Sequence, residues 1–419
     1  MPIASELAAA PDTGSHALSF APPPARKIAK VLLLDAYSTR SLACARSWGR
    51  NGVAFAVGGE SRWDMSLLSR YAREKFVYTS PKRDLAKFIA DINGYARKFS
   101  ADGIFPTSEA AILACNQYRH QLACTPVIPA EREIEVMFSK AKTLELAKSL
   151  GLRAPQTIHI TPENVRDLDS IPLRFPAVVK SESSETLGSD RTATSRKTAY
   201  VFNPQELQSE CRSRLAQGQS VLLQEWIDGY GVGVSGLFSD GLPVAVIGHR
   251  RIRESNPCGG PSALAETIEL SAELLQPALA LMRAAGVNGP AMVEYKVDRR
   301  TGQPYLMEIN GRFWGSVLLA SAAGLELPYL YWKKLNGIEI RPEETHYRTG
   351  VRGRYIVGDT KCLWLCLKGK PPDWPGEIAG RWDSLKSYFG SFLDRRTTEL
   401  ILTSDDPVPF LGRLMQPNS

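Results

Sequence analysis

The sequence predicts a protein of mixed architecture: a three-layer α/β domain at the N-terminus, followed by an α+β half built on an antiparallel sheet. Two observations predict it. Up to about residue 130, apolar runs alternate with amphipathic stretches, which is typical of strands alternating with helices. Beyond that point, strand patterns follow one another across short polar turns such as "SDG", which indicates antiparallel hairpins.

Length and composition indicate a globular protein of two or three domains, because the chain has 419 residues and 43% of them are hydrophobic. Residues 1–27 include three consecutive prolines and no continuous apolar segment, so we expect a disordered lead and no signal peptide. No window approaches the roughly 18 apolar residues of a membrane span. The seven cysteines are scattered singly, which argues against a zinc site or disulfides and favours a cytoplasmic location.

The charge of the chain permits anionic ligands but does not indicate a nucleic-acid partner. The formal net charge is +7, yet the 51 basic residues are spread along the chain among 44 acidic ones. The densest basic run, "HRRIR", is short and has the spacing of a strand end. We therefore expect small-molecule partners and no binding to nucleic acid.

The N-terminal domain begins with the stretch 30–57, whose pattern predicts a strand, a helix and a second strand. Its first turn, "DAYSTRS", lacks the glycines of a dinucleotide-binding loop, so we exclude NAD binding here. A helix, a strand and a further helix are expected at about 83–98, at 102–106 and from residue 108. Thr107, Ser108 and Glu109 follow a strand end where ligands can bind, but a helix cap is the preferred interpretation.

The second half begins with a helical pattern over 131–157 that ends at Gly151 and carries Leu144, Ala147 and Leu150 on one face. A strand, "FPAVVK", and a polar turn follow. Further helices are expected at 204–216 and at 272–285, with three strands between them. A last hairpin joins "PAMVEYKVD" to "QPYLMEIN" across "RRTGQ".

Polar residues on the last two predicted strands point to a metal and phosphate site. Adjacent antiparallel strands can bring Glu294 and Glu308 together, and Asn310 faces the same side as Glu308 because side chains alternate. Mg²⁺ prefers oxygen ligands and bridges nucleotide phosphates through one or two carboxylates, and Mn²⁺ can take its place. Arg312 continues the alternation and would set a cation beside the phosphates. The alternative is a solvated network of ion pairs.

Together with Lys140, Lys180 and the segment "QEWI", this set resembles the ATP-grasp superfamily over about residues 30–340. Within it, the chain is most similar to the carboxylate-amine ligase branch related to the ATP-binding domain of carbamoyl-phosphate synthase. The most specific part is "MEINGRF" after "VEYK". The resemblance implies a pre-ATP-grasp domain over 28–130, an ATP-grasp domain over 131–340 with a lid at about 157–226, and a C-terminal extension over 341–419.

The resemblance also implies a nucleotide site. Lys140 and Lys180 would contact the phosphates of ATP, although a solvated surface lysine is the alternative for Lys140. The adenine edge would meet the segment Gln224, Glu225, Trp226 and Ile227, with Asp228 as a candidate for the ribose.

Three positions depart from the family's pattern. Ser139 stands where an aspartate usually precedes the first lysine, and Gly231 stands where many members carry a ribose-binding acid. The lid turn has Gly188 as its one glycine, so Arg191 and the neighbouring hydroxyls would have to hold the phosphates. These departures bear on nucleotide affinity more than on metal binding.

The segment 249–267 is the expected acceptor region. Arg251 and Arg253 are predicted on one strand face, with Arg250 on the other, ahead of a Gly-Gly-Pro loop. Guanidinium groups and free amides suit a substrate carboxylate or an acyl-phosphate oxyanion, whereas solvated arginines in an ordinary loop are the alternative. Cys258 is a poor candidate nucleophile, since the sequence suggests no histidine beside it.

The resemblance implies an ATP-dependent ligase that phosphorylates a carboxylate and lets an amine or another nucleophile displace the phosphate. Two alternatives stay open: a kinase or carboxylase-like enzyme, and a nucleotide-binding regulatory protein without turnover. Residues 341–419 suggest no chemistry, and they are expected to pack on the preceding domain or to form a homodimer surface. Phe313 and Trp314 are expected to pack beneath the site, with contact to substrate as the alternative.

Overall fold

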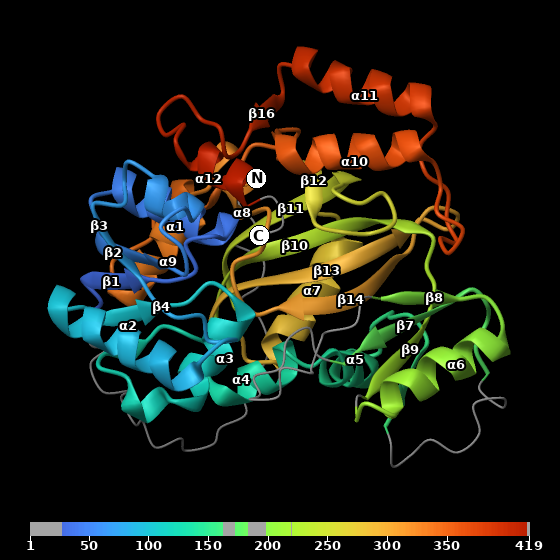
Figure 1. The fold of residues 1–419 in the computed structure, drawn as a ribbon, viewed down its shortest axis with the longest axis horizontal. Coiled ribbons are helices and arrows are strands. Elements are labelled where there is room, and N and C mark those ends of the chain that lie inside the picture. The colour runs from blue at the N-terminus through green and yellow to red at the C-terminus, as the bar shows by residue number, and fades with distance from the viewer. Residues whose placement is uncertain (1–26, 162–171, 183–197, 219, 417–419) are drawn as a thin grey trace, which may run out of the picture.

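The computed structural model of the chain describes residues 27–161, 172–182, 198–218 and 220–416. Within these residues the strands form a parallel sheet of five strands, an antiparallel sheet of four and a mixed sheet of seven (Figure 1). The predicted combination of α/β and α+β parts is therefore confirmed. Residues 1–26 of the predicted lead, and Gly188 and Arg191 of the predicted lid turn, lie outside the described residues. Across the described ranges, no helix is both long and apolar enough to cross a bilayer.

The N-terminal sheet has the strand order β3-β2-β1-β4-β5. Its strands are β1 (Lys30–Leu33), β2 (Ala54–Gly59), β3 (Glu74–Val77), β4 (Gly103–Phe105) and β5 (Thr125–Pro126). Its helices are α1 (Thr39–Arg50), α2 (Leu85–Phe99) and α3 (Glu109–Gln117), with short 3-10 turns at Met65–Leu68 and Arg119–Gln121. Val31 and Leu33 of β1 join the core that contains residues of α1, whereas Leu32 and Leu34 join the core that contains residues of α2. This alternation buries both faces of the sheet and gives the three layers.

A buried aspartate joins the carboxyl ends of β1 and β4. Asp35 is 1% exposed, and one of its oxygens accepts hydrogen bonds from the amides of Thr107 and Ser108, both at 2.7 Å. The Ser108 hydroxyl donates to the other oxygen at 2.9 Å and caps α3 by accepting from the amide of Ala111. The helix-cap interpretation of this strand end is therefore confirmed for Ser108.

The helical stretch predicted from residue 131 and ending at Gly151 is interrupted in the structure. The structure has two helices, α4 (Glu131–Met137) and α5 (Lys140–Ser149), and the break places Ser139 as the N-cap of α5. Ser139 accepts a hydrogen bond from the amide of Lys142, and a serine with this local bond favours a new helix start over a continuous helix. Leu144 and Ala147 are buried, but Leu150 is 39% exposed because it follows the last turn of α5.

The four-stranded sheet has the order β6-β9-β7-β8 and its own apolar core. Its strands are β6 (Thr157–Ile160), β7 (Ala177–Ser181), β8 (Ala199–Val201) and β9 (Val221–Glu225), and α6 (Pro204–Leu215) packs on it. Leu207 and Cys211 of α6 are buried in that core beside Val179 and Leu223. In Figure 1 this sheet lies beside the seven-stranded sheet, joined to it by the short passage from β9 to β10.

The seven-stranded sheet has the order β14-β13-β10-β11-β12-β15-β16. Its strands are β10 (Gly229–Ser239), β11 (Leu242–Glu254), β12 (Ser262–Ile268), β13 (Gly289–Asp298), β14 (Pro304–Asn310), β15 (Arg352–Arg354) and β16 (Thr397–Glu399). Helices α7 (Ala272–Ala284), α8 (Val317–Ala322) and α9 (Leu327–Leu335) accompany it. Both predicted hairpins are confirmed, since Ser239 pairs with Leu242 and Val297 pairs with Pro304.

The segment after residue 340 contributes to this sheet and also covers it. A 3-10 turn at Pro342–Thr345 precedes β15 and α10 (Ile356–Lys368), and α11 (Arg381–Leu393), β16 and α12 (Pro409–Met415) follow. Figure 1 shows α10 and α11 lying together above the β11 and β12 side of the sheet, with the loop between them descending toward β8. Tyr200 of β8 meets Trp374 of this loop edge to face, with ring centroids 4.9 Å apart.

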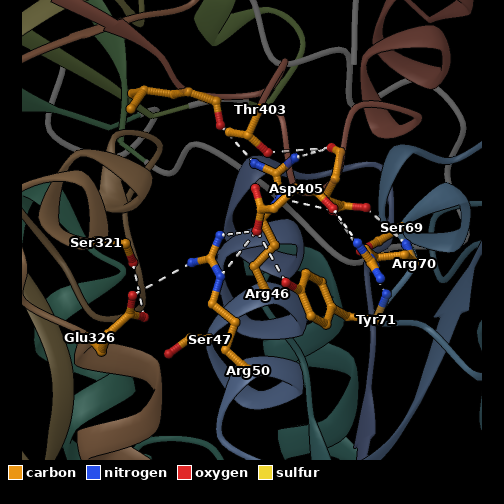
Figure 2. A network of polar contacts seen from close by, with 12 residues as sticks. Arg46, Ser47, Arg50, Ser69, Arg70, Tyr71, Ser321, Glu326, Thr403 and Asp405 are labelled. Carbon is orange, nitrogen blue, oxygen red and sulfur yellow. Dashed lines mark hydrogen bonds and ion pairs between the residues drawn. The ribbon is translucent and has the colours of Figure 1, made fainter.

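A buried ion-pair network locks α1 to the segment after β16 (Figure 2). Arg46 is 2% exposed, and its Nε donates to Asp406 at 2.9 Å while its other nitrogens donate to the carbonyls of Leu400 and Ile401. Arg50, on the next turn of α1, donates to Asp405 at 2.8 Å. The first helix and the last segment of the chain are therefore held together by charge-assisted hydrogen bonds.

Candidate active site

Two carboxylates face each other on β13 and β14. Glu294 is the register partner of Glu308, and the register shifts directly after Glu294. Burial raises the pKa of Glu294, and the charge of Glu308 adds to that shift while Arg251 opposes it. Burial also acts to raise the pKa of Glu308, but the ammonium groups of Lys140 and Lys180 outweigh it, so the net shift is downward. The pKa of each carboxyl group therefore depends on neighbouring cations.

The two predicted phosphate-binding lysines converge on Glu308 from different elements. Lys140 is the first residue of α5, and its Nζ lies 3.6 Å from a carboxylate oxygen of Glu308. Lys180 on β7 donates a hydrogen bond of 2.8 Å to the amide oxygen of Gln224. Burial lowers the pKa of Lys180 to about 8, with Lys140 adding to the shift and Glu308 opposing it. A ligand with negative charge would relieve this crowding of cations.

Asn310 and Arg312 lie at the end of β14. The side-chain amide of Asn310 donates to Glu308 at 3.2 Å, so both stand on one face as predicted. The strand ends at Asn310, and Arg312 lies beyond it in the turn that follows. Its guanidinium reaches the N-terminal domain, where it lies 4.0 Å from the carboxylate of Glu109. The charge of Arg312 also lowers the pKa of Glu308. Arg312 therefore acts on the carboxylate pair and also contacts the N-terminal domain.

Sequence reasoning missed a second arginine at this boundary, Arg40 of α1. Burial, followed by the charge of Arg312, lowers the pKa of Arg40 to about 10. Its Nε is buried and has no hydrogen-bond partner among the described residues. No sequence signal could have found Arg40, because it joins Arg312 only through the packing of α1 near the turn after β14.

The predicted adenine segment lies where β9 passes into β10. Gln224 is 2% exposed, and the amide of Glu225 donates to the carbonyl of Gln156 at 2.8 Å. Ile227 is buried, and the ring of Trp226 meets Trp374 edge to face. Within the described ranges, no hydrogen bond engages the main-chain groups of Trp226 or Ile227. These two residues therefore offer donors and acceptors of the kind that a base edge needs.

Asp228, the candidate for the ribose, follows Ile227 directly and lines a cavity together with Gly231 and Arg251. Its side chain is 54% exposed and lies 3.7 Å from the guanidinium of Arg299. This ion pair is largely exposed, so it adds little to stability.

Gly231 allows an arginine to cross the floor of the site. Arg251 on β11 donates to Glu294 at 2.7 Å and to Glu254 at 3.2 Å. A Cβ at Gly231 would lie 2.8 Å from Cδ of Arg251, which is closer than side-chain carbons approach. The glycine that departs from the family's pattern therefore makes room for Arg251 to reach Glu294.

Arg253 does not reach the carboxylate pair. The register of β11 shifts between Arg251 and Arg253, and the Arg253 guanidinium donates to both oxygens of Asp359 on α10 at 2.6 and 2.8 Å. Arg250 pairs with Glu266 at 2.7 Å. The three arginines of this run therefore have different acidic partners. The partner of Arg253, Asp359, belongs to the segment after residue 340.

The aromatic pair after β14 belongs to the core. Phe313 and Trp314 are 1% and 2% exposed, and Phe313 packs against Phe105 of β4 and Tyr331 of α9. The packing interpretation is therefore confirmed. Burial raises the pKa of Cys258 to about 11, which agrees with its expected inertness as a nucleophile.

The side chains present fit a magnesium ion that is shared with phosphates. Glu294, Glu308 and Asn310 supply two carboxylates and one amide oxygen on one face. In the described part of the chain, no group of three or more histidine, cysteine or acidic side chains could hold a metal without help. A set this small suits Mg²⁺, which keeps waters and phosphate oxygens among its ligands.

Part of the chain that contains these residues matches a known protein family. Residues 217–358 match the family model described as "ATP-grasp in the biosynthetic pathway with Ter operon". The matched range contains Glu294, Glu308, Asn310 and Arg312.

Individual proteins show the same likeness. The D-alanine–D-alanine ligase of Carboxydothermus hydrogenoformans is 24% identical over 188 residues, which are 41% of this chain and 57% of the relative, so the chain spans little more than half of that relative. The L-amino acid ligase of Bacillus licheniformis has a TM-score of 0.57 at 17% identity, covering 79% of each chain. The biotin carboxylase domain dimer of Hydrogenobacter thermophilus 2-oxoglutarate carboxylase, solved with MgADP and bicarbonate, has a TM-score of 0.58 at 17% identity and covers 78% of this chain and 73% of that one.

Proposed function

The chain belongs to the ATP-grasp superfamily, and from that premise we propose that it is an ATP-dependent ligase that joins a carboxylate to an amine through an acyl phosphate. One observation carries the proposal: Glu294 and Glu308 face each other in register while Lys140 and Lys180, from two other elements, both act on Glu308. Opposite charges gathered in this way suit a nucleotide triphosphate together with its metal ion.

The roles follow from the charges. Lys140 and Lys180 would hold the phosphates, and the main chain of Trp226 and Ile227 would bind the adenine edge. Glu294, Glu308 and Asn310 would hold Mg²⁺, or Mn²⁺ in its place, and this ion would neutralise charge on the transferred phosphoryl group. Arg312 would stand beside the carboxylate that receives the phosphoryl group. Two of the similar proteins are named as ligases of amino acids, a D-alanine–D-alanine ligase and an L-amino acid ligase, which agrees with this choice.

The proposed chemistry has two steps and needs no nucleophile from the protein. A carboxylate oxygen attacks the γ-phosphorus, and the bond from that phosphorus to the bridging oxygen breaks, so that ADP leaves. The amine nitrogen then attacks the acyl carbon, the carbon–oxygen bond to phosphate breaks, and the amine loses its proton to solvent. The protein contributes positioning and charge stabilisation, which are large terms in phosphoryl and acyl transfer.

Release of ADP over a panel of carboxylates and amines tests the proposal. We expect ADP only when both partners are present, and we expect Glu308→Gln to abolish the release while the far-UV circular dichroism spectrum stays unchanged. Near-normal ligation by Glu308→Gln would contradict the metal assignment. Release with one partner alone would instead support a kinase or carboxylase-like enzyme, and binding of ADP without any release would support a regulatory protein.

A homodimer also stays a proposal. The related biotin carboxylase domain is described as a dimer, and α11 carries exposed apolar side chains such as Trp382 and Leu393, which are 83% and 86% exposed. Sedimentation analysis of the full chain would decide between a monomer and a dimer.

A further inference from the structure

Helices α10 and α11 lie beside each other, and each turns one side toward the seven-stranded sheet. Thr360 of α10 and Tyr388 of α11 are joined by a hydrogen bond of 2.8 Å between their hydroxyls. Arg253 of β11 donates to Asp359 on α10 at 2.6 Å and to the hydroxyl of Ser391 on α11 at 2.6 Å. The opposite sides of both helices therefore face away from the sheet, and Figure 1 shows the pair at one edge of the molecule.

The outward side of α11 carries a stripe of exposed apolar side chains. Trp382 and Leu393 are 83% and 86% exposed, and Phe389 is 58% exposed. Each of the three lies two residues from Ser384 or Ser391, the buried residues of this helix. Because two residues turn about 200° around a helix, the stripe points away from the sheet.

The outward side of α10 adds a tryptophan between two lysines. Lys361, Trp364 and Lys368 are exposed, and each lies two residues from a buried residue of α10. The ammonium of Lys368 stands 3.5 Å from the centroid of the Trp364 ring. A further exposed lysine lies within the stripe of α11. Together these side chains make up the α10–α11 face: Lys361, Trp364, Lys368, Trp382, Lys386, Phe389 and Leu393.

The charge of the α10–α11 face is positive. None of its lysines has an ion pair with a described residue. Of the acidic residues on the two helices, Asp359 is 0% exposed and paired with Arg253, and Asp383 stands near the exposed Arg381 at the start of α11. The acidic residues of the loop between the helices belong to the segment that descends toward β8 in Figure 1. The face therefore favours a partner of negative charge.

A second copy of the chain matches this face poorly. A twofold contact brings the same surface of both protomers together, so lysines of one copy would meet lysines of the other without an acidic partner. A membrane with anionic lipids has no such cost. Its boundary between headgroups and acyl chains accepts tryptophan, phenylalanine and leucine, and lysines beside such side chains are typical of helices that lie on anionic membranes.

We propose that the α10–α11 face docks on a membrane that contains anionic lipids. Trp382, Phe389 and Leu393 enter the boundary between headgroups and acyl chains, and the lysines contact the headgroup phosphates. This inference goes beyond the proposed ligase function, because it concerns where the protein acts and not which bond it forms. It also gives a role to exposed side chains of the segment after residue 340, for which the sequence suggested no chemistry.

Flotation with lipid vesicles tests the docking. The full chain should bind vesicles of an equal mixture of phosphatidylcholine and phosphatidylglycerol at least about tenfold more tightly than vesicles of phosphatidylcholine alone, and added salt should reduce this difference. Trp382→Gln combined with Leu393→Gln should weaken binding to the mixed vesicles by about tenfold or more. The far-UV circular dichroism spectrum should stay unchanged, because both side chains project into solvent.

The matched control lies on α12, where Leu411 and Leu414 are 56% and 51% exposed but the helix packs on the N-terminal domain near Met65. Leu411→Gln combined with Leu414→Gln should leave vesicle binding unchanged. Lys361→Gln combined with Lys386→Gln should weaken binding to the mixed vesicles by about tenfold or more. Arginine at both lysine positions should retain the affinity, because it keeps the cations.

Brominated lipids locate the contact. Brominated phosphatidylcholine in the mixed vesicles should quench tryptophan fluorescence, and Trp382→Phe should bind as tightly as the unchanged protein but lose a large part of the quenching. Failure of the unchanged protein to prefer the mixed vesicles, or undiminished binding by the variant with Trp382→Gln and Leu393→Gln, would overturn the proposal. So would a dimer that this variant separates into monomers, because the face would then be a contact between two copies.

Discussion

The ion-pair network between α1 and the segment after β16 contrasts with the site around Glu308, although both are built from basic and acidic side chains. In the network, the side chains of Arg46 and Asp406 are 3% and 1% exposed, and Arg46 has hydrogen bonds from Nε and from both terminal nitrogens. In the site, Lys140 and Glu308 are 20% and 31% exposed and lie 3.6 Å apart. In the first region the charged side chains are buried and paired within the protein. In the second region the charged side chains stay partly exposed.

In the second region, neighbouring like charges also shift one another's pKa. Glu294 faces Glu308, Lys140 lowers the pKa of Lys180, and Arg312 lowers the pKa of Arg40. Such neighbours cost stability unless a ligand neutralises them, so their presence indicates a binding site more strongly than the number of charged residues does. Complete pairing within the protein therefore marks a structural network, whereas crowded like charges that lack such pairing mark a functional one.

The largest expected effect is a loss of stability when the buried ion pair between Arg46 and Asp406 is broken. Arg46→Ala should lower the free energy of unfolding by about 3–5 kcal/mol, because it leaves the buried Asp406 without its cation. Arg50→Ala, whose pair with Asp405 is more than a third exposed, should cost less than about 1 kcal/mol and is the control. Denaturant unfolding of both variants measures the difference. Equal losses would show that burial does not distinguish these pairs.

A smaller effect is expected at Gly231. Gly231→Ala should push Arg251 away from Glu294, because the added Cβ would lie 2.8 Å from Arg251 Cδ, and kcat/KM for ADP release should fall by roughly tenfold. Gly94→Ala is the control: its added Cβ meets nothing within 4 Å, and alanine within α2 should raise stability by about 0.5–1 kcal/mol. Full activity in Gly231→Ala would remove Arg251 from the proposed site.

The smallest effect concerns pH. The pKa of Lys180 is lowered to about 8 in the folded protein from an ordinary 10.5, so between these values the unfolded chain holds a proton that the native protein has lost. Stability contributed by Lys180 should therefore rise as pH increases from about 8 to 10.5, while affinity for ADP should fall because the ammonium is neutralised. Denaturant unfolding and ADP titration across this range measure both trends, with Lys180→Met as the reference. Identical profiles for the two proteins would show that Lys180 does not titrate there.

The architecture and the acidic pair could be predicted from local patterns of the sequence. Alternating apolar runs indicated the α/β part, and "SDG" and "RRTGQ" marked both hairpins of the seven-stranded sheet, because turn chemistry and side-chain alternation are local properties. The same alternation put Glu308 and Asn310 on one face. It did not anticipate the break at Ser139, because a short capping interaction overrode a continuous helical pattern.

Contacts between residues far apart in the sequence could not be predicted in this way, because they depend on how the elements pack. The approach of Arg40 to Arg312, the passage of Arg251 over Gly231, and the pairing of Arg253 with Asp359 of α10 depend on packing between segments far apart in the chain. Local patterns carry no record of such contacts, because any exposed arginine or lysine satisfies the same pattern whether or not another element approaches it. The physical reason is that burial and neighbouring charge, which set the properties of these side chains, exist only once the elements have packed.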